Sequence, residues 1–144
     1  MKLEDREDLI KLSIPNKPEY VSVVRLTASA IASRIGFNIE EIEDIKVAVA
    51  EVCTNIIRNG LKNDNMNFDI EFNIYTDKLC ITVTNTGEKI CEDVTRNENL
   101  NSIEEQEEAK LGLFIIQALM DEVECLENGT NFEIKMTKKI GVGN

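Results

Sequence analysis

The chain has 144 residues, which suits one domain with a core of its own and is too short for two ordinary domains. Its 27 acidic residues outnumber its 16 basic ones, and the formal net charge of -11 would repel a nucleic acid backbone. No apolar segment of the kind that directs secretion opens the chain, and no apolar run is long enough to cross a membrane. We therefore expect a cytoplasmic protein with no direct nucleic acid partner and no membrane insertion.

The cysteines also bear on the type of protein. Cys53, Cys80, Cys91 and Cys125 are irregularly spaced without a C-x-x-C pair, and the chain has no histidine, so a structural zinc site is not expected. The first of them falls in an expected helix, and the second and fourth fall in expected strands. We interpret them as reduced, small apolar side chains, as is usual in the cytoplasm.

The first 60 residues predict a strand followed by two helices. Residues 10–15 alternate apolar and polar side chains up to a proline, as a strand does. Apolar residues then recur at helical spacing over 21–35, and Gly36 supplies a stop. Residues 38–41 form a capping-box variant that opens a second helix, which we expect to end at Gly60.

The sequence after Gly60 predicts two hairpins separated by a long loop and a helix. Residues 68–74 and 79–83 alternate on either side of a Thr-Asp-Lys turn. The periodicity disappears over about 92–110, where acidic residues dominate, and we expect a mobile lid there. A helix resumes over 111–124, and the pair at 128–129, Asn-Gly, is typical of the turn in a last hairpin.

This order of elements predicts an α/β (α+β) fold for a single domain over residues 1–144. The expected architecture is a two-layer sandwich, with a mixed, mostly antiparallel sheet and helices on one of its faces. The lid is long for so small a domain, and loops of that length are usually functional or disordered.

Glu51 and Asn55 stand out within the second predicted helix, "IKVAVAEVCTNIIRNG". They lie one turn apart at the edge of its apolar stripe. By itself this spacing favours a hydrogen-bonded pair at the border of the core. A solvated face, or a site that handles a metal and a proton, are the alternatives.

Two glycine motifs bear on that choice. In "NTG", Gly87 follows a predicted strand, where the lack of Cβ suits either close approach to a ligand or a simple turn. In "KLGL", we expect Gly112 to open a helix whose free N–H groups meet phosphate oxygens, with Lys110 beside them as a positive charge. A helix-start glycine without a ligand is the alternative.

In their order along the chain, "EVCTN", "NTG" and "KLGL" resemble the N box and the two glycine boxes of the GHKL fold, the histidine-kinase-like ATPase or Bergerat fold. From about Ile14 to about Lys139, "PEYVSVVRLTASAIASRIGF", "EIEDIKVAVAEVCTN" and "LGLFIIQALMDEV" more closely resemble anti-sigma-factor serine/threonine kinases of the RsbW and SpoIIAB type. The resemblance implies a homodimer that sequesters an alternative sigma factor. It also implies that ATP and Mg²⁺ are used to phosphorylate a serine or threonine of an anti-anti-sigma factor, a STAS-type protein.

The resemblance further implies roles for individual residues. Glu51 would orient or deprotonate the attacking hydroxyl, and Asn55 would give an oxygen to a magnesium ion that retains most of its waters. Thr130 would hydrogen-bond beneath adenine, although hairpin turn chemistry also explains it. Arg25 matches an arginine that the family uses to contact partner proteins, and a solvated helix face is the alternative.

Several positions depart from the family pattern. Asn85 replaces the aspartate that accepts a hydrogen bond from the adenine amino group, so the charge is absent and its NH₂ needs another partner. Asn59 replaces a frequent histidine, and the glycine-rich lid is reduced to "EEAKLGL", where Ala109 and Lys110 lack the backbone freedom of glycine.

These departures leave two hypotheses open. One is the kinase, favoured because both residues of the N-box pair are present. The other is a binding module that holds sigma without effective nucleotide turnover. The catalytic domain of a histidine kinase is disfavoured, because the chain has no histidine and no dimerisation-helix segment.

Overall fold

The computed structural model describes residues 6–59, 67–86, 103–128 and 131–141. Five strands, three α-helices and a short 3₁₀ helix account for most of these residues. In chain order they are β1 (Asp8–Pro15), the 3₁₀ helix (Pro18–Tyr20), α1 (Val21–Ile35), α2 (Ile39–Asn59), β2 (Asn67–Ile74), β3 (Lys78–Thr86), α3 (Ile103–Leu119), β4 (Glu122–Asn128) and β5 (Asn131–Lys139). None of the described helices combines the length and the apolar character that a membrane crossing requires.

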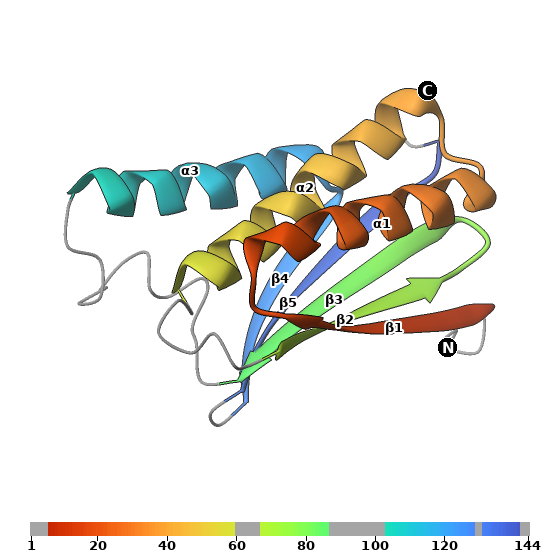
Figure 1. Cartoon of the computed structure of the whole chain (residues 1–144). Helices are drawn as coiled ribbons and strands as arrows, with labels where there is room; N and C mark the ends of the chain where they lie inside the picture. The colour runs from red at the N-terminus through yellow and green to blue at the C-terminus, as the bar shows by residue number, and fades with distance from the viewer. Residues whose placement is uncertain (1–5, 60–66, 87–102, 129–130, 142–144) are drawn as a thin grey trace.

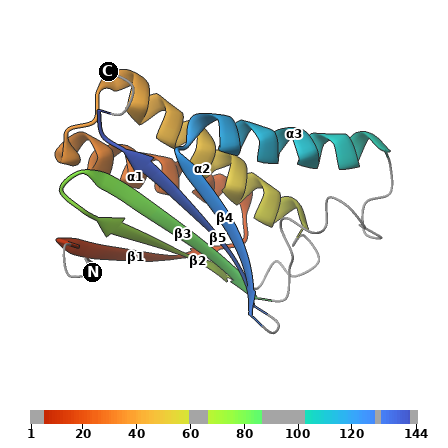
Figure 2. The ribbon, with the colours of Figure 1, turned by 180° about the vertical axis from the view of Figure 1, so that it is seen from behind.

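The strands form one sheet in the order β1-β2-β3-β5-β4, and all three helices cover the same face of it (Figures 1 and 2). The predicted two-layer α/β sandwich is thus confirmed. The prediction of a mixed sheet is wrong, because every pairing between the described strands is antiparallel. β3 and β4 run the same way, since each pairs antiparallel with β5, but β5 lies between them.

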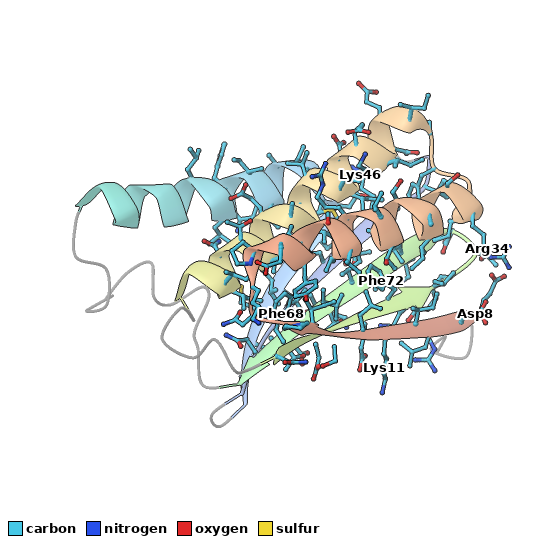
Figure 3. All side chains as sticks on the ribbon, in the orientation of Figure 1. Asp8, Lys11, Arg34, Lys46, Phe68 and Phe72 are labelled. Atoms are coloured by element: carbon cyan, nitrogen blue, oxygen red, sulfur yellow. The ribbon has the colours of Figure 1, made fainter. Side chains whose placement is uncertain are left out.

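The core lies between the sheet and the helices. The inward-facing residues of β2 alternate with outward-facing ones as the sequence predicts, and Phe68 and Phe72 are at most 1% exposed. Figure 3 shows both rings between the sheet and the helices, whereas Lys11 of β1 points away from them. α2 lies between α1 and α3 and packs against each. It is therefore the most enclosed helix of the layer.

The helix ends confirm the predicted caps. Gly36 has a positive φ of 112°, and its N–H donates to the carbonyl oxygens of Ala32 and Ser33 at the end of α1. At the start of α2, the backbone N–H of Glu41 donates to Oδ1 of Asn38 at 2.7 Å. The N–H of Asn38 donates in return to Oε1 of Glu41 at 2.8 Å, which completes the capping box.

The lid prediction is wrong at its C-terminal end. α3 begins at Ile103, so residues 103–110 are helical, and Lys110 and Gly112 lie well inside α3 instead of at its start. The segment "IEEQEEAK" has no apolar periodicity, but glutamate, glutamine, alanine and lysine all favour helix. The free N–H groups of the first turn of α3 are therefore not at Gly112.

The cysteines follow the sequence interpretation only in part. Cys53 is fully buried and Cys80 is 7% exposed, and both are free thiols. Cys125, in contrast, is exposed and takes part in a disulfide. Its interpretation as a reduced, small apolar side chain is therefore wrong. It is exposed because β4 is an edge strand with less cover than the central strands.

Candidate functional site

The site begins on α2, where the helix carries both apolar and polar inward positions. Val52, Cys53 and Ile56 are fully buried and hold this part of α2 in the core. Glu51 is half-buried beside them, and Asn55, one turn later, is 7% exposed. The carboxylate and the amide are therefore fixed by a rigid helix instead of a loop.

Gly112 of α3 lies against this pair. A Cβ on Gly112 would stand 2.9 Å from Oε2 of Glu51 and 3.4 Å from Nδ2 of Asn55. Gly112, Ile116 and Met120 recur every four residues as the buried stripe of α3, so the glycine faces α2. Because it has no side chain, the α3 backbone can approach the carboxylate closely. The structure thus brings three sequence-predicted residues together. Gly112 lets the backbone of α3 come close to α2, whereas the sequence analysis expected it to supply the free N–H groups of a helix start.

The C-terminal end of α3 is tied to the sheet by Lys138 of β5. Its Nζ donates to the carbonyl oxygen of Leu119 at 2.6 Å and lies 3.3 Å from Oδ2 of Asp44 on α2. A cation at the last carbonyls also complements the helix dipole. This lysine was missed by the sequence analysis. The alternation along β5 could have predicted that it points inward, since Lys138 continues the inward-facing positions of Ile134 and Met136.

Asn85 adds a polar group near the end of β3. It continues the inward-facing series of Leu79, Ile81 and Val83, and it is 5% exposed. Its Nδ2 has no hydrogen-bond partner within the described parts of the chain. The end of β3 and the end of α2 lie at the same end of the molecule (Figures 1 and 2). A buried donor without a partner is costly, at about 1–3 kcal/mol, and is typical of a position that a ligand completes.

The other predicted site residues are less informative. Arg25 is exposed on α1, which lies on the other side of α2 from α3, so it does not join the cluster of Glu51, Asn55 and Gly112. Asn59 ends α2 and Lys110 lies within α3, but the side chains of both fall outside the described part. Gly87 and Thr130 lie outside the described residues altogether.

The residues present fit a magnesium nucleotide. Within the described ranges no group of three or more His, Cys, Asp or Glu residues could enclose a metal, as zinc or calcium would require. Magnesium needs few protein oxygens when phosphates are present, so Asn55 alone would suffice as a protein ligand. The unpartnered donor of Asn85 fits an organic ligand at this end of the molecule.

A hollow of about 490 Å³ lies on the sheet face opposite the helices. Its lining includes Arg6, Glu71, Asn73 and Lys135, and Nη1 of Arg6 donates to Oδ1 of Asn73 at 3.0 Å. These are the outward-facing positions of the strands. The sheet separates this hollow from Glu51, so it takes no part in the site above.

Comparison with known proteins gives the class first. The histidine kinase-like ATPase domain family matches residues 14–138, nearly the whole chain. Two solved structures have the same fold: the RsbU and RsbW domains of a Mycobacterium tuberculosis protein and the SiaB–SiaC complex of Pseudomonas aeruginosa. The first has a TM-score of 0.69 at 15% identity and covers 93% of this chain and 33% of that one. The second has a TM-score of 0.68 at 13% identity and covers 94% and 92%.

The relatives then give the family. "Serine-protein kinase RsbW" of Bacillus pumilus is 38% identical, and that of Bacillus subtilis 34%, each over 94% of this chain and 88% of the relative. The protein of the same name from Listeria monocytogenes serotype 4a is 41% identical over 92% of this chain and 88% of its own length. The chain belongs to the RsbW family of serine-protein kinases, within the histidine kinase-like ATPases.

Proposed function

We propose that this protein is a cytoplasmic anti-sigma factor with kinase activity. It sequesters an alternative sigma factor, and it uses Mg-ATP to phosphorylate a serine or threonine of an anti-anti-sigma factor. The observation that carries the kinase part is the contact of Gly112 with Glu51 and Asn55, since a Cβ there would stand 2.9 Å from the carboxylate. That contact joins the N-box pair to the second glycine motif, which are separated by some 60 residues in the sequence.

The roles of the side chains follow from their chemistry. The carboxylate of Glu51 accepts the proton of the attacking hydroxyl or orients it, which positions the acceptor for transfer. The amide oxygen of Asn55 would hold the magnesium ion, which would neutralise charge on the phosphates. Because Glu51 and Asn55 both stand on α2, one rigid element sets the distance between the carboxylate and the amide.

The proposed assembly is a homodimer formed through β1 and α1. β1 is an edge strand of the sheet. Four large apolar residues in this region are exposed: Ile10 38%, Tyr20 38%, Val23 43% and Leu26 69%. Exposed apolar residues grouped on one edge favour an interface. A second copy of the chain fits best, since two-fold pairing would cover the same residues on both copies.

The sigma factor would also bind at the helical layer. Arg25 is exposed on α1 and is the proposed contact. The net charge of -11 favours a partner that presents basic residues. This part of the proposal requires no nucleotide chemistry, and therefore a binding module without effective kinase activity is the second candidate. The observation that favours it is that Asn85 is a neutral amide and lacks the charge of the aspartate that the family pattern has at this position.

One experiment separates the two candidates. The full chain is titrated with ATP by calorimetry in the presence and absence of magnesium, and is then incubated with labelled ATP and the cognate anti-anti-sigma factor. The kinase predicts magnesium-dependent binding and transfer of label to the antagonist. Strong capture of the sigma factor with no detectable transfer would overturn the kinase and leave the binding module.

A further inference from the structure

The side-chain amide of Asn85 can donate a hydrogen bond, which an ionised carboxylate at the same position could not do. It is 5% exposed on the inward face of β3, and its Nδ2 has no partner among the described residues. Thr137, by contrast, is another buried polar residue, and its Oγ1 lies 3.4 Å from Sγ of Cys80. A buried donor that no protein group satisfies is available to a ligand.

The chemistry of the two side chains differs in what each can recognise. An ionised carboxylate only accepts hydrogen bonds, so it matches the amino group at position 6 of adenine and repels a keto oxygen there. An amide has one accepting and one donating end, and it can be turned by 180° to exchange them. It therefore has a matching orientation for either substituent.

The pairing with the group at position 6 is sufficient for this. With a 6-aminopurine, Oδ1 of Asn85 accepts from the amino group. With a 6-oxopurine, Nδ2 donates to O6, and this pairing satisfies the buried donor that the protein leaves open.

We propose that Asn85 makes the nucleotide site of this chain accept 6-oxopurine nucleotides, such as ITP and GTP, as well as ATP. The inference rests on the proposed function, since it takes the base of a bound nucleotide to lie against the end of β3. It extends that function by naming a wider class of substrate. The base is then selected by the shape of the pocket and not by the group at position 6.

The test is a set of calorimetric titrations of the full chain with Mg-ATP and Mg-ITP. ITP is the sharper probe, because it differs from ATP only in the substituent and protonation at the N1–C6 edge, and GTP is run third. The variant is Asn85→Asp. The matched control is Asn73→Asp, which makes the same change of charge on β2, at the hollow on the opposite sheet face.

We expect the unmutated chain and Asn73→Asp to bind ATP and ITP with dissociation constants within about tenfold of each other. Asn85→Asp should retain ATP and lose affinity for ITP by about 10- to 100-fold, because a carboxylate that faces O6 finds no donor there. Asn85→Ala, which buries no charge, should weaken both nucleotides to a similar extent. Circular dichroism of each variant verifies that it is folded.

The outcomes are distinct. If the unmutated chain binds ATP but binds ITP more than 100-fold more weakly, the inference is wrong and the proposed function stands. An unchanged ratio of ITP to ATP affinity in both Asn85 variants would also overturn it. If no nucleotide binds to the folded, unmutated chain, both the inference and the kinase function are contradicted.

Discussion

Gly112 and Glu51 are in contact across the interface of α3 and α2, such that a methyl group on the glycine would stand 2.9 Å from Oε2 of the carboxylate. Real Cβ atoms do not approach an oxygen so closely, so any side chain at position 112 would displace the carboxylate. The conformation of Glu51 is thus set in part by a glycine on another helix.

The first prediction is that Gly112→Ala lowers activity without lowering stability. The added methyl group should shift the end of the flexible Glu51 side chain and reduce phosphate transfer by about tenfold or more. Alanine within a helix is more stable than glycine by about 0.5–1 kcal/mol, which offsets the crowding. Transfer assays and thermal unfolding measure the two effects, with Gln117→Ala on the exposed face of α3 as control. Unchanged transfer would show that Glu51 needs no fixed position.

The second prediction separates the two residues of the N-box pair. Glu51→Gln should lower phosphate transfer by about 10²-fold, the usual scale for loss of a general base, and leave nucleotide binding nearly intact. Asn55→Ala should instead lose magnesium-dependent nucleotide binding. Labelled phosphate transfer and calorimetry are run beside Glu40→Gln, an exposed carboxylate in the first turn of the same helix. Equal transfer by Glu51→Gln and the unmutated chain would remove Glu51 from its proposed role.

The third prediction concerns the assembly. Light scattering should give the mass of a homodimer, and Leu26→Glu should produce a monomer, because it places a charge at the most exposed of the four apolar residues of the proposed interface. Leu111→Glu, on α3 and 57% exposed in the unmutated chain, should remain dimeric. An unmutated chain that is monomeric throughout the micromolar range would contradict the proposed dimer.

The fourth prediction tests the capping box of α2. Asn38→Ala removes the acceptor of the Glu41 N–H, a 2.7 Å bond, and should lower the free energy of unfolding by about 1 kcal/mol. Glu41→Gln keeps an acceptor for the Asn38 N–H and should cost less. Urea unfolding gives both values, and Ser33→Ala, at an exposed position of α1, serves as the control. Equal stability of Asn38→Ala and the control would refute the cap.

The fifth prediction follows from the burial of Cys53. Loss of hydration raises the pKa of its thiol from 9.0 to about 12. The folded chain therefore retains this proton at pH values where the unfolded chain releases it. The resulting contribution to stability is complete below pH 9 and is lost as the pH rises toward 12.

Two measurements check this prediction. Mass spectrometry after treatment with iodoacetamide should find Cys53 unmodified in the native protein and modified in urea, because only the thiolate reacts. The difference in unfolding free energy between the unmutated chain and Cys53→Ala should shrink as the pH rises above 9.0. Rapid native alkylation of Cys53 would be inconsistent with the buried thiol.

Local features were predictable where a few neighbouring residues decide the outcome. The left-handed stop at Gly36, the capping pair of Asn38 and Glu41, and the alternation of β2 all appear as the sequence predicts. The start of α3 was not predicted, because residues 103–110 have high helix propensity without an apolar face, and periodicity detects only the face.

The sequence by itself determined that Glu51 and Asn55 share one face of a helix, since the period of the helix settles this. Only the tertiary structure decided that Gly112 meets Glu51, that Lys138 ties α3 to the sheet, and that β5 separates β3 from β4. These relations join residues distant along the chain. They depend on how helices and strands pack in three dimensions, which no local period in the sequence records.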